Sequence, residues 1–314
     1  MPHLTGWINE PTAVAESLAR MESAGRSVSF AATRSELKGY WQSLVERGST
    51  GVFLQDAETE LFGQTQPAFH QQIGSCVSMG TARAIQDTAY WALAQRGDIG
   101  RPVQIATEPI YAGSRIEIGH GQLGHGDGSI GAWAAEWVHN GGMLARGVYG
   151  QIDLTQLRDD LASEWGAPGC GVPAELEAEC RTHLVGACHK LDTVVDMADA
   201  IAAGHAVAYC CGRIRGKPNA AGYAASDSNG GHCTEIQAVL LDTAGRLAFV
   251  EQQSWGNYPD IAIHLQFQGG VKVLRQGSYG VYGDDLSRCL DQGGEAWCFD
   301  QVALWRPNSL EEMQ

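Results

Sequence analysis

The stretch Ile73-Gly74-Ser75-Cys76-Val77-Ser78-Met79-Gly80 decides how the rest of the chain is interpreted. The small and apolar residues in and after it predict a long helix from about Ser75 to Gln95, which Gly97 would stop. Cys76 would then lie in the first helical turn, where free backbone N–H groups and the helix dipole favour a thiolate. Cys76 is therefore a candidate nucleophile, and the alternative is a small buried apolar residue.

A cysteine nucleophile needs a base, and His232 is the candidate. It stands at the entry of a strand predicted over residues 235–241. A third polar group has to orient the imidazole. Gln253, which follows the next predicted hairpin, supplies one, and the adjacent Gln252 competes for the same role. Outside this order of motifs, His232 would be interpreted as a packing or capping histidine.

The order Gly74-Ser75-Cys76, then Gly231-His232 before a strand, then Ser254-Trp255-Gly256 resembles the papain-like cysteine peptidases. That family has a Gln ahead of Gly-Ser-Cys, a His entering a strand, and Asn-Ser-Trp-Gly. The resemblance covers roughly residues 60 to 282. It implies an α+β, papain-like two-lobed fold: a helical lobe plus an antiparallel β-barrel-like lobe, with the site in the cleft between them.

The resemblance also implies a role for each matching residue. Cys76 would be the nucleophile, and His232 would act as general base and then as general acid. Gln253 would orient the imidazole, and Trp255 would shield the hydrogen bond between them from water. Gly128 would lie where a substrate backbone approaches the cleft closely, whereas an ordinary flexible loop is the alternative interpretation of its glycine-rich surroundings.

Two supporting positions depart from the family pattern. Gln253 stands where the family has Asn, so its amide is one methylene further from the backbone. The family's oxyanion-hole Gln lies six residues before the cysteine, and this chain has His70 there. Gln71 is the preferred donor if the loop is one residue shorter, with His70 and Gln72 as alternatives. Loss of one oxyanion donor costs about 100- to 1000-fold in rate.

Composition restricts the partners. Asp plus Glu number 36 and Lys plus Arg 21, which gives a formal net charge of −15 and disfavours nucleic acid as a partner. The first residues hold no apolar run of signal-peptide length, and no run is long enough to span a membrane. We therefore expect a cytoplasmic protein with no membrane partner, whose nine cysteines are mostly free thiols.

Neither a metal nor another cofactor is expected. A zinc site would need closely spaced ligand pairs. The available residues are separated irregularly; they are Cys170, Cys180, His183, Cys188 and His189. Buried thiols are the simpler interpretation, and the proposed cysteine chemistry needs no cofactor.

Three regions are predicted along the chain. Residues 1–60 form an N-terminal helical arm or pro-like segment, in which Thr33 and Glu36 have the spacing of a capping box for a second helix. Residues 61–204 form the helical lobe with the nucleophile helix. Residues 205–314 form the β lobe with His232 and a C-terminal extension, because short strand-like runs replace helices there.

Three functions are compatible with these observations. The first is a cysteine peptidase that hydrolyses peptide or isopeptide bonds through a thioester intermediate, with a peptide or protein substrate. The second is a non-enzymatic structural or interaction protein that kept the fold, for example a bacteriophage virion component that binds other proteins of an assembly. The third is a cell-wall endopeptidase or amidase, against which the Ser254-Trp255-Gly256 motif argues.

Overall fold

The computed structural model describes residues 6–25, 28–97 and 103–302. Its helices are α1 (Pro11–Ser23), α2 (Phe30–Thr33), η1 (Ser35–Leu37), α3 (Tyr40–Glu46), α4 (Gln55–Phe62), α5 (Cys76–Arg96), α6 (Glu108–Gly113), η2 (Ser114–Ile118), α7 (Gly131–Asn140), α8 (Asp159–Trp165), α9 (Ala174–Cys180), α10 (Val194–Ala202) and α11 (Gly283–Asp291). Its strands are β1 (Gly51–Phe53), β2 (Val148–Tyr149), β3 (Ile152–Asp153), β4 (Val185–Lys190), β5 (Val207–Arg215), β6 (Ser226–Leu241), β7 (Leu247–Gln252), β8 (His264–Phe267), β9 (Gly270–Val273), β10 (Ser278–Tyr282) and β11 (Glu295–Val302). The end of the predicted C-terminal extension, with Trp305, lies outside the described residues.

The main sheet has the strand order β10-β7-β6-β5-β11-β4, and β1 pairs with the C-terminal half of β6. Every strand pair named within the described ranges is antiparallel. Helices combined with antiparallel sheets confirm the predicted α+β class. The sheet runs as an open path from β10 to β4 in this part of the chain and does not close into a barrel.

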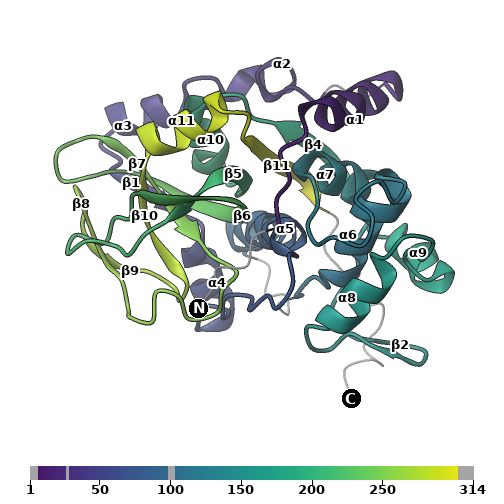
Figure 1. The fold of residues 1–314 in the computed structure, drawn as a ribbon. Helices are drawn as coiled ribbons and strands as arrows, with labels where there is room; N and C mark the ends of the chain where they lie inside the picture. Colours follow the sequence, from purple (N-terminus) through teal and green to yellow (C-terminus); the bar gives the residue numbers. More distant parts are fainter. Residues whose placement is uncertain (1–5, 26–27, 98–102, 303–314) are drawn as a thin grey trace.

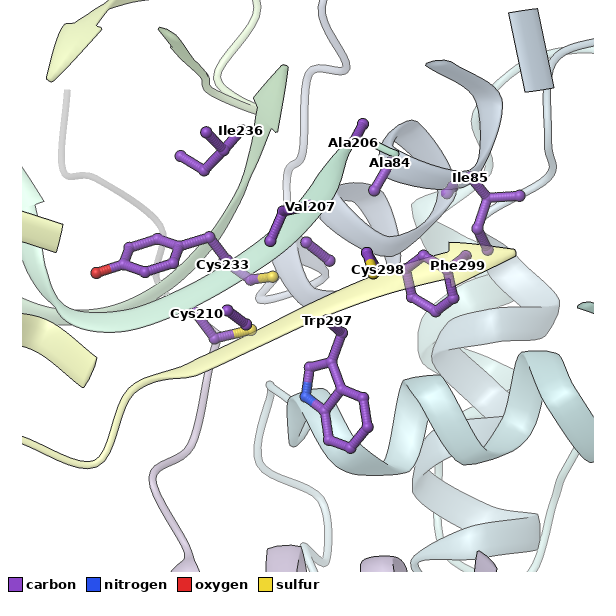
Figure 2. Packing of buried hydrophobic residues seen from close by; sticks show 14 of the residues in the cluster. Ala84, Ile85, Ala206, Val207, Cys210, Cys233, Ile236, Trp297, Cys298 and Phe299 are labelled. Atoms are coloured by element: carbon purple, nitrogen blue, oxygen red, sulfur yellow. The ribbon is translucent and has the colours of Figure 1, made fainter. Parts of the chain in front are cut away.

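Helix α5 is the centre of the molecule, with most of the sheet on one side and α6 to α9 on the other (Figure 1). Residues 76–90 are all buried, because most of their side chains are small or apolar and the charged Arg83 and Asp87 are paired inside the molecule. Ala84 and Ile85 pack beside β5 and β11, where Trp297 and Phe299 fill the core (Figure 2). The predicted helix over 75–95 is thereby confirmed.

The predicted helix beginning at Thr33 is wrong. The chain instead forms α2, η1 and α3 in succession. The carboxylate of Asp199 on α10 accepts the backbone N–H groups of Gly39 and Trp41, each at 2.8 Å, and thereby fixes the start of α3. A capping box does form elsewhere, between Thr193 and Asp196 at the start of α10.

The first 60 residues pack against both parts of the fold. Arg20 on α1 forms an ion pair of 2.7 Å with Glu136 on α7, and β1 pairs with β6. Strand β4, which precedes the predicted boundary at residue 204, pairs with β11, which follows it. The N-terminal region thus contacts both a helix and the main sheet, and the limits of the predicted regions stay a prediction.

Candidate active site

Cys76 is the first residue of α5 and its side chain is fully buried, with 0% exposure. The backbone N–H of Cys233, the residue after His232, donates to the Cys76 sulfur at 3.4 Å. Burial is the largest influence on the thiol and raises its pKa, whereas hydrogen bonds from the backbone of Cys233, Gly6 and Val77 lower it by less. The expected thiolate is therefore disfavoured in this arrangement, because desolvation outweighs the helix terminus.

His232 lies on β6, and its Nε2 is 2.6 Å from Oε1 of Gln253. Gln253 directly follows β7, whose pairing with β6 brings the two side chains together. Both are 3% exposed. Gln252, the competitor for this position, faces away, since its Nε2 donates to the backbone carbonyl of Gln276 at 2.9 Å. Of the two adjacent glutamines, Gln253 is therefore the one that contacts the imidazole.

Trp255 stacks on His232, with ring centroids 4.3 Å apart and an angle of 15° between the planes. The chain around it runs alongside residues 69–71, because the backbone N–H of Gly256 donates to Phe69 and that of Gln71 donates to Ser254. The tryptophan therefore covers the imidazole beside the residues that the sequence proposed as oxyanion donors.

Those three donor candidates differ in their surroundings. Gln71 is buried, its Nε2 donates to the backbone carbonyl of Ile73 at 3.0 Å, and its Oε1 accepts from the Ser254 hydroxyl. His70 and Gln72 are both exposed. In this conformation the Gln71 amide is therefore fixed at both ends, by the backbone of its own loop and by Ser254.

Glu251 is a polar neighbour of the pair that sequence reasoning missed. Its Oε1 accepts from Nε2 of Gln253 at 2.8 Å and from the hydroxyl of Tyr279 at 3.3 Å, and its Oε2 accepts from Nε of Arg215 at 3.2 Å. The available signal was the two-residue period of a strand, which places Glu251 and Gln253 on one face. An isolated glutamate on a strand does not otherwise indicate such a role.

Arg115 shapes the glycine-rich loop that contains Gly128. Its guanidinium donates to the backbone carbonyls of Gly128, Gly124 at 2.9 Å and Gly126 at 2.6 Å. It also donates to Gly166 at 2.9 Å. Four carbonyls thus converge on one buried cation, which gives the predicted flexible loop a defined course.

Residues 6–8, which we call the 6–8 segment, lie between this loop and the histidine strand. The backbone N–H groups of Gly6 and Trp7 donate to Gly231 at 2.9 and 3.1 Å, and the segment exchanges hydrogen bonds with Ser129 at 2.9 and 2.7 Å. A Cβ at Gly128 (φ +106°) would lie 2.6 Å from the Gly6 carbonyl oxygen. Figure 1 shows the dark purple chain before α1 running toward α5.

The buried carboxylate of Glu295 anchors this segment. It accepts from the indole Nε1 of Trp7 at 2.8 Å and from that of Trp297 at 3.1 Å. It also accepts from the backbone N–H groups of Gly131 and Ala132 at the start of α7, at 3.1 and 2.7 Å. A single side chain on the last described strand therefore connects the 6–8 segment to a helix N-terminus.

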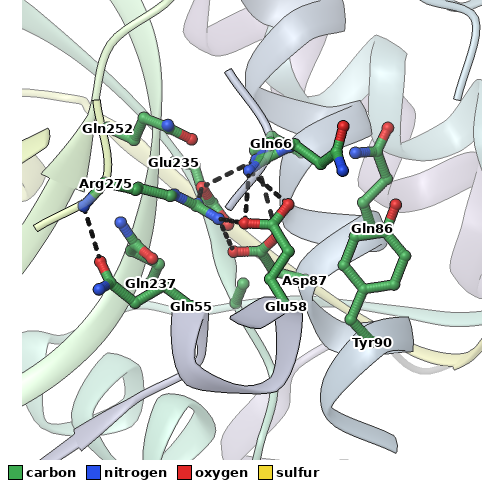
Figure 3. Close-up of polar contacts among 12 residues, drawn as sticks. Gln55, Glu58, Gln66, Gln86, Asp87, Tyr90, Glu235, Gln237, Gln252 and Arg275 are labelled. Carbon is green, nitrogen blue, oxygen red and sulfur yellow. Dashed lines mark hydrogen bonds and ion pairs between the residues drawn. The ribbon is translucent and has the colours of Figure 1, made fainter. Parts of the chain in front are cut away.

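A buried ion network lies under the site and links its elements (Figure 3). Arg275 forms ion pairs with Asp87 on α5 at 2.7 Å, with Glu58 on α4 at 3.2 Å, and with Glu235 on β6. Arg83 on α5 pairs with Glu58 at 2.9 Å. The cysteine helix and the histidine strand are thus held in fixed relation by three carboxylates and two guanidinium groups.

Within the described ranges, no cluster of three or more His, Cys, Asp or Glu side chains is arranged to hold a metal ion. All nine cysteines lie in those ranges, and none of them forms a disulfide. The same part of the chain contains no helix that is both long and apolar enough to cross a membrane.

A cysteine helix packed on an antiparallel sheet that carries the histidine is the papain-like fold, and the chain has this fold. The solved structures similar to it include xylellain, a cysteine protease from Xylella fastidiosa, and procathepsin B from Trypanosoma congolense. Xylellain has a TM-score of 0.52 and 13% identity, with 95% of this chain and 92% of that chain covered. Procathepsin B has a TM-score of 0.53 and 11% identity, with 93% and 85% covered.

No protein-family model and no curated protein sequence matches this chain. The likeness to papain-like proteins therefore rests on the fold and on a few short motifs. None of the comparisons supports an association with a virion.

Proposed function

We propose that this protein is a papain-like cysteine peptidase whose substrate site is filled by its own N-terminal segment. The hydrogen bond between His232 and Gln253 carries the proposal. The pair is buried beneath Trp255 and holds the imidazole in one orientation, as a catalytic base requires. The backbone contact of Cys233 with Cys76 joins this pair to the nucleophile.

In the proposed reaction, His232 takes the proton of the Cys76 thiol while the sulfur attacks a peptide or isopeptide carbonyl carbon. The backbone N–H of Cys76 and a released Gln71 amide would donate to the oxyanion. His232 then gives its proton to the leaving amine as the C–N bond breaks, which leaves a thioester. Water, deprotonated by His232, hydrolyses the thioester and restores the thiol.

The 6–8 segment must leave before a substrate can bind. Its backbone hydrogen bonds to Ser129 lie at the end of the glycine-rich loop where the resemblance has a substrate approach, and Gly6 contacts Cys76. Trp7 is 6% exposed and is held by Glu295. We therefore expect low activity while the 6–8 segment is bound, and higher activity when the contact between Trp7 and Glu295 is weakened.

Labelling with an epoxide that alkylates cysteine nucleophiles tests the proposal near neutral pH. We expect slow labelling of the wild type, faster labelling of Trp7→Ala, and none at this position in Cys76→Ala. Trp7→Phe, which keeps an aromatic ring but removes the indole N–H, is the milder variant, and Cys180→Ala is the control for a buried thiol away from the site. Absence of Cys76 labelling in folded Trp7→Ala and Trp7→Phe would contradict the peptidase.

A non-enzymatic protein that retains the fold is the second candidate. The fully buried Cys76 and the internally held Gln71 amide favour it. In that case Cys76→Ala would leave the biological function intact, and no variant of Trp7 would make Cys76 reactive.

A further inference from the structure

We propose that Glu251 is a positioning residue that fixes the orientation of the Gln253 amide and so keeps the ring proton of His232 on Nε2. The inference rests on the proposed function of Cys76 and His232, and it assigns a role to a carboxylate that touches neither of the reacting atoms.

The Gln253 side chain bridges two groups of opposite hydrogen-bonding character. Its Nε2 donates to Oε1 of Glu251 at 2.8 Å, while its Oε1 lies 2.6 Å from Nε2 of His232. A carboxylate accepts hydrogen bonds and cannot donate them. If the amide turned over, its oxygen would face the Glu251 oxygen, so the observed orientation is strongly favoured.

Tyr279 reinforces the same orientation. Its hydroxyl donates to Glu251 at 3.3 Å, which directs an oxygen lone pair toward the second N–H of the Gln253 amide. Both amide hydrogens therefore meet acceptors. The Tyr279 side chain is 0% exposed, so water does not compete at this position.

Arg215 supplies the counter-charge for Glu251. Its Nε donates to Oε2 of Glu251 at 3.2 Å, and the two side chains are only 1% and 4% exposed. A second guanidinium nitrogen of Arg215 donates to the hydroxyl of Ser226. Because a guanidinium only donates, this contact requires Glu251 to present an accepting oxygen to Arg215.

The orientation of the amide determines the imidazole tautomer. Because Oε1 of Gln253 can only accept, Nε2 of His232 has to carry the proton. In a neutral imidazole the lone pair is then on Nδ1, where a base that takes the thiol proton needs it. The order Arg215, Glu251, Gln253, His232 is therefore a directional chain in which each member sets the hydrogen-bonding role of the next.

Nitrogen NMR of the full chain with ¹⁵N-labelled histidine tests this inference directly, with the His232 signals identified by their loss in His232→Asn. We expect a protonated Nε2 in the wild type and a mixture of tautomers in Glu251→Gln, whose amide can present either end to Gln253. Glu136→Gln, which removes a buried carboxylate paired with Arg20, is the matched control and should leave the His232 signals unchanged.

The inference is overturned if the wild type carries the proton on Nδ1, a result that needs no variant to fold. It is also overturned if folded Glu251→Gln keeps the wild-type tautomer. These outcomes are independent of Cys76 labelling. An unreactive Cys76 with the expected tautomer would contradict the peptidase alone, and a reactive Cys76 with the wrong tautomer would contradict the role of Glu251 alone.

Discussion

The indole of Trp255 lies flat against the imidazole of His232, with centroids 4.3 Å apart and planes 15° apart. Trp255 is half-buried, while His232 is only 3% exposed. The indole therefore covers one face of the imidazole that contacts Gln253.

Removal of this cover should weaken the hydrogen bond beneath it. Stacked aromatic pairs contribute about 0.5–1.5 kcal/mol, which corresponds to up to about tenfold in rate. We expect Trp255→Ala, in the Trp7→Ala background, to slow Cys76 labelling by about that factor and to speed exchange of the His232 ring proton with water. Trp255→Phe keeps a ring over the imidazole and is the control. Unchanged proton exchange in Trp255→Ala would contradict the shielding role.

Shortening Gln253 to the family's Asn should reduce activity in this chain. The longer side chain spans from His232 to Glu251, and an Asn amide would reach only one of them. A buried polar group without its partner costs about 1–3 kcal/mol, so we expect Gln253→Asn to slow labelling by roughly 5- to 100-fold. Gln252→Asn, whose amide bonds away from the site, should have little effect. A faster reaction in Gln253→Asn would contradict the argument.

Displacement of the 6–8 segment should make the Cys76 thiol more acidic. Burial raises its pKa in the closed form, so exposure of the sulfur removes the largest cause of the shift. We expect the pH dependence of alkylation in Trp7→Ala to move to lower pH than in the wild type. Equal profiles for the two proteins would show that the segment does not control desolvation of Cys76.

The contribution of Glu235 to stability should change with pH in the opposite sense to that of a carboxylate whose pKa is lowered by folding. Burial raises its pKa, and the ion network contains three carboxylates but only two guanidinium groups. Between its ordinary pKa and the raised folded value, the folded protein holds a proton that the unfolded chain has lost. The contribution of Glu235 to stability is therefore present at low pH and falls as pH rises through this window.

The variant Glu235→Gln removes that titration. Relative to the wild type, its free energy of unfolding should rise as pH increases from about the ordinary Glu value of 4.3, which urea unfolding at several pH values measures. Arg275→Met is the contrasting variant, since it leaves buried carboxylates unpaired and should cost about 3–5 kcal/mol. A constant difference between Glu235→Gln and wild type across pH would contradict the raised pKa.

Arg115 should determine whether the glycine-rich loop is ordered. Because its guanidinium holds four backbone carbonyls, Arg115→Met is expected to increase amide hydrogen exchange over residues 119–129 by at least about tenfold, as expected for the loss of more than 1.4 kcal/mol of local stability. Arg96→Met, at an exposed helix end, is the control. Unchanged exchange in the loop would contradict this role.

The positions of the site residues that belong to short local motifs could be predicted from the sequence. Cys76 begins a helix whose composition is distinctive, and Trp255 belongs to a short motif that follows a strand. Strand pairing then brings Gln253 to His232, as the order of motifs predicted. The catalytic roles of these residues stay a prediction that the labelling experiments test.

The rest depends on contacts between distant parts of the chain. The 6–8 segment is held mainly by backbone hydrogen bonds, which leave no side-chain pattern in the sequence. Glu251 resembles any polar strand residue until Arg215 and Tyr279 are placed beside it. The capping box at Thr33 does not form because Asp199, far along the chain, captures the start of α3 instead.

Tethering gives the 6–8 segment an advantage over any free peptide. It joins α1 within a few residues, and α1 is held to α7 by Arg20, so the segment competes at an effective concentration on the order of millimolar. Substrates then bind only the open fraction of molecules, and their apparent dissociation constants rise by the reciprocal of that fraction. A change at Trp7 would therefore shift the apparent affinity for every substrate by one common factor and leave the rate at saturation unchanged.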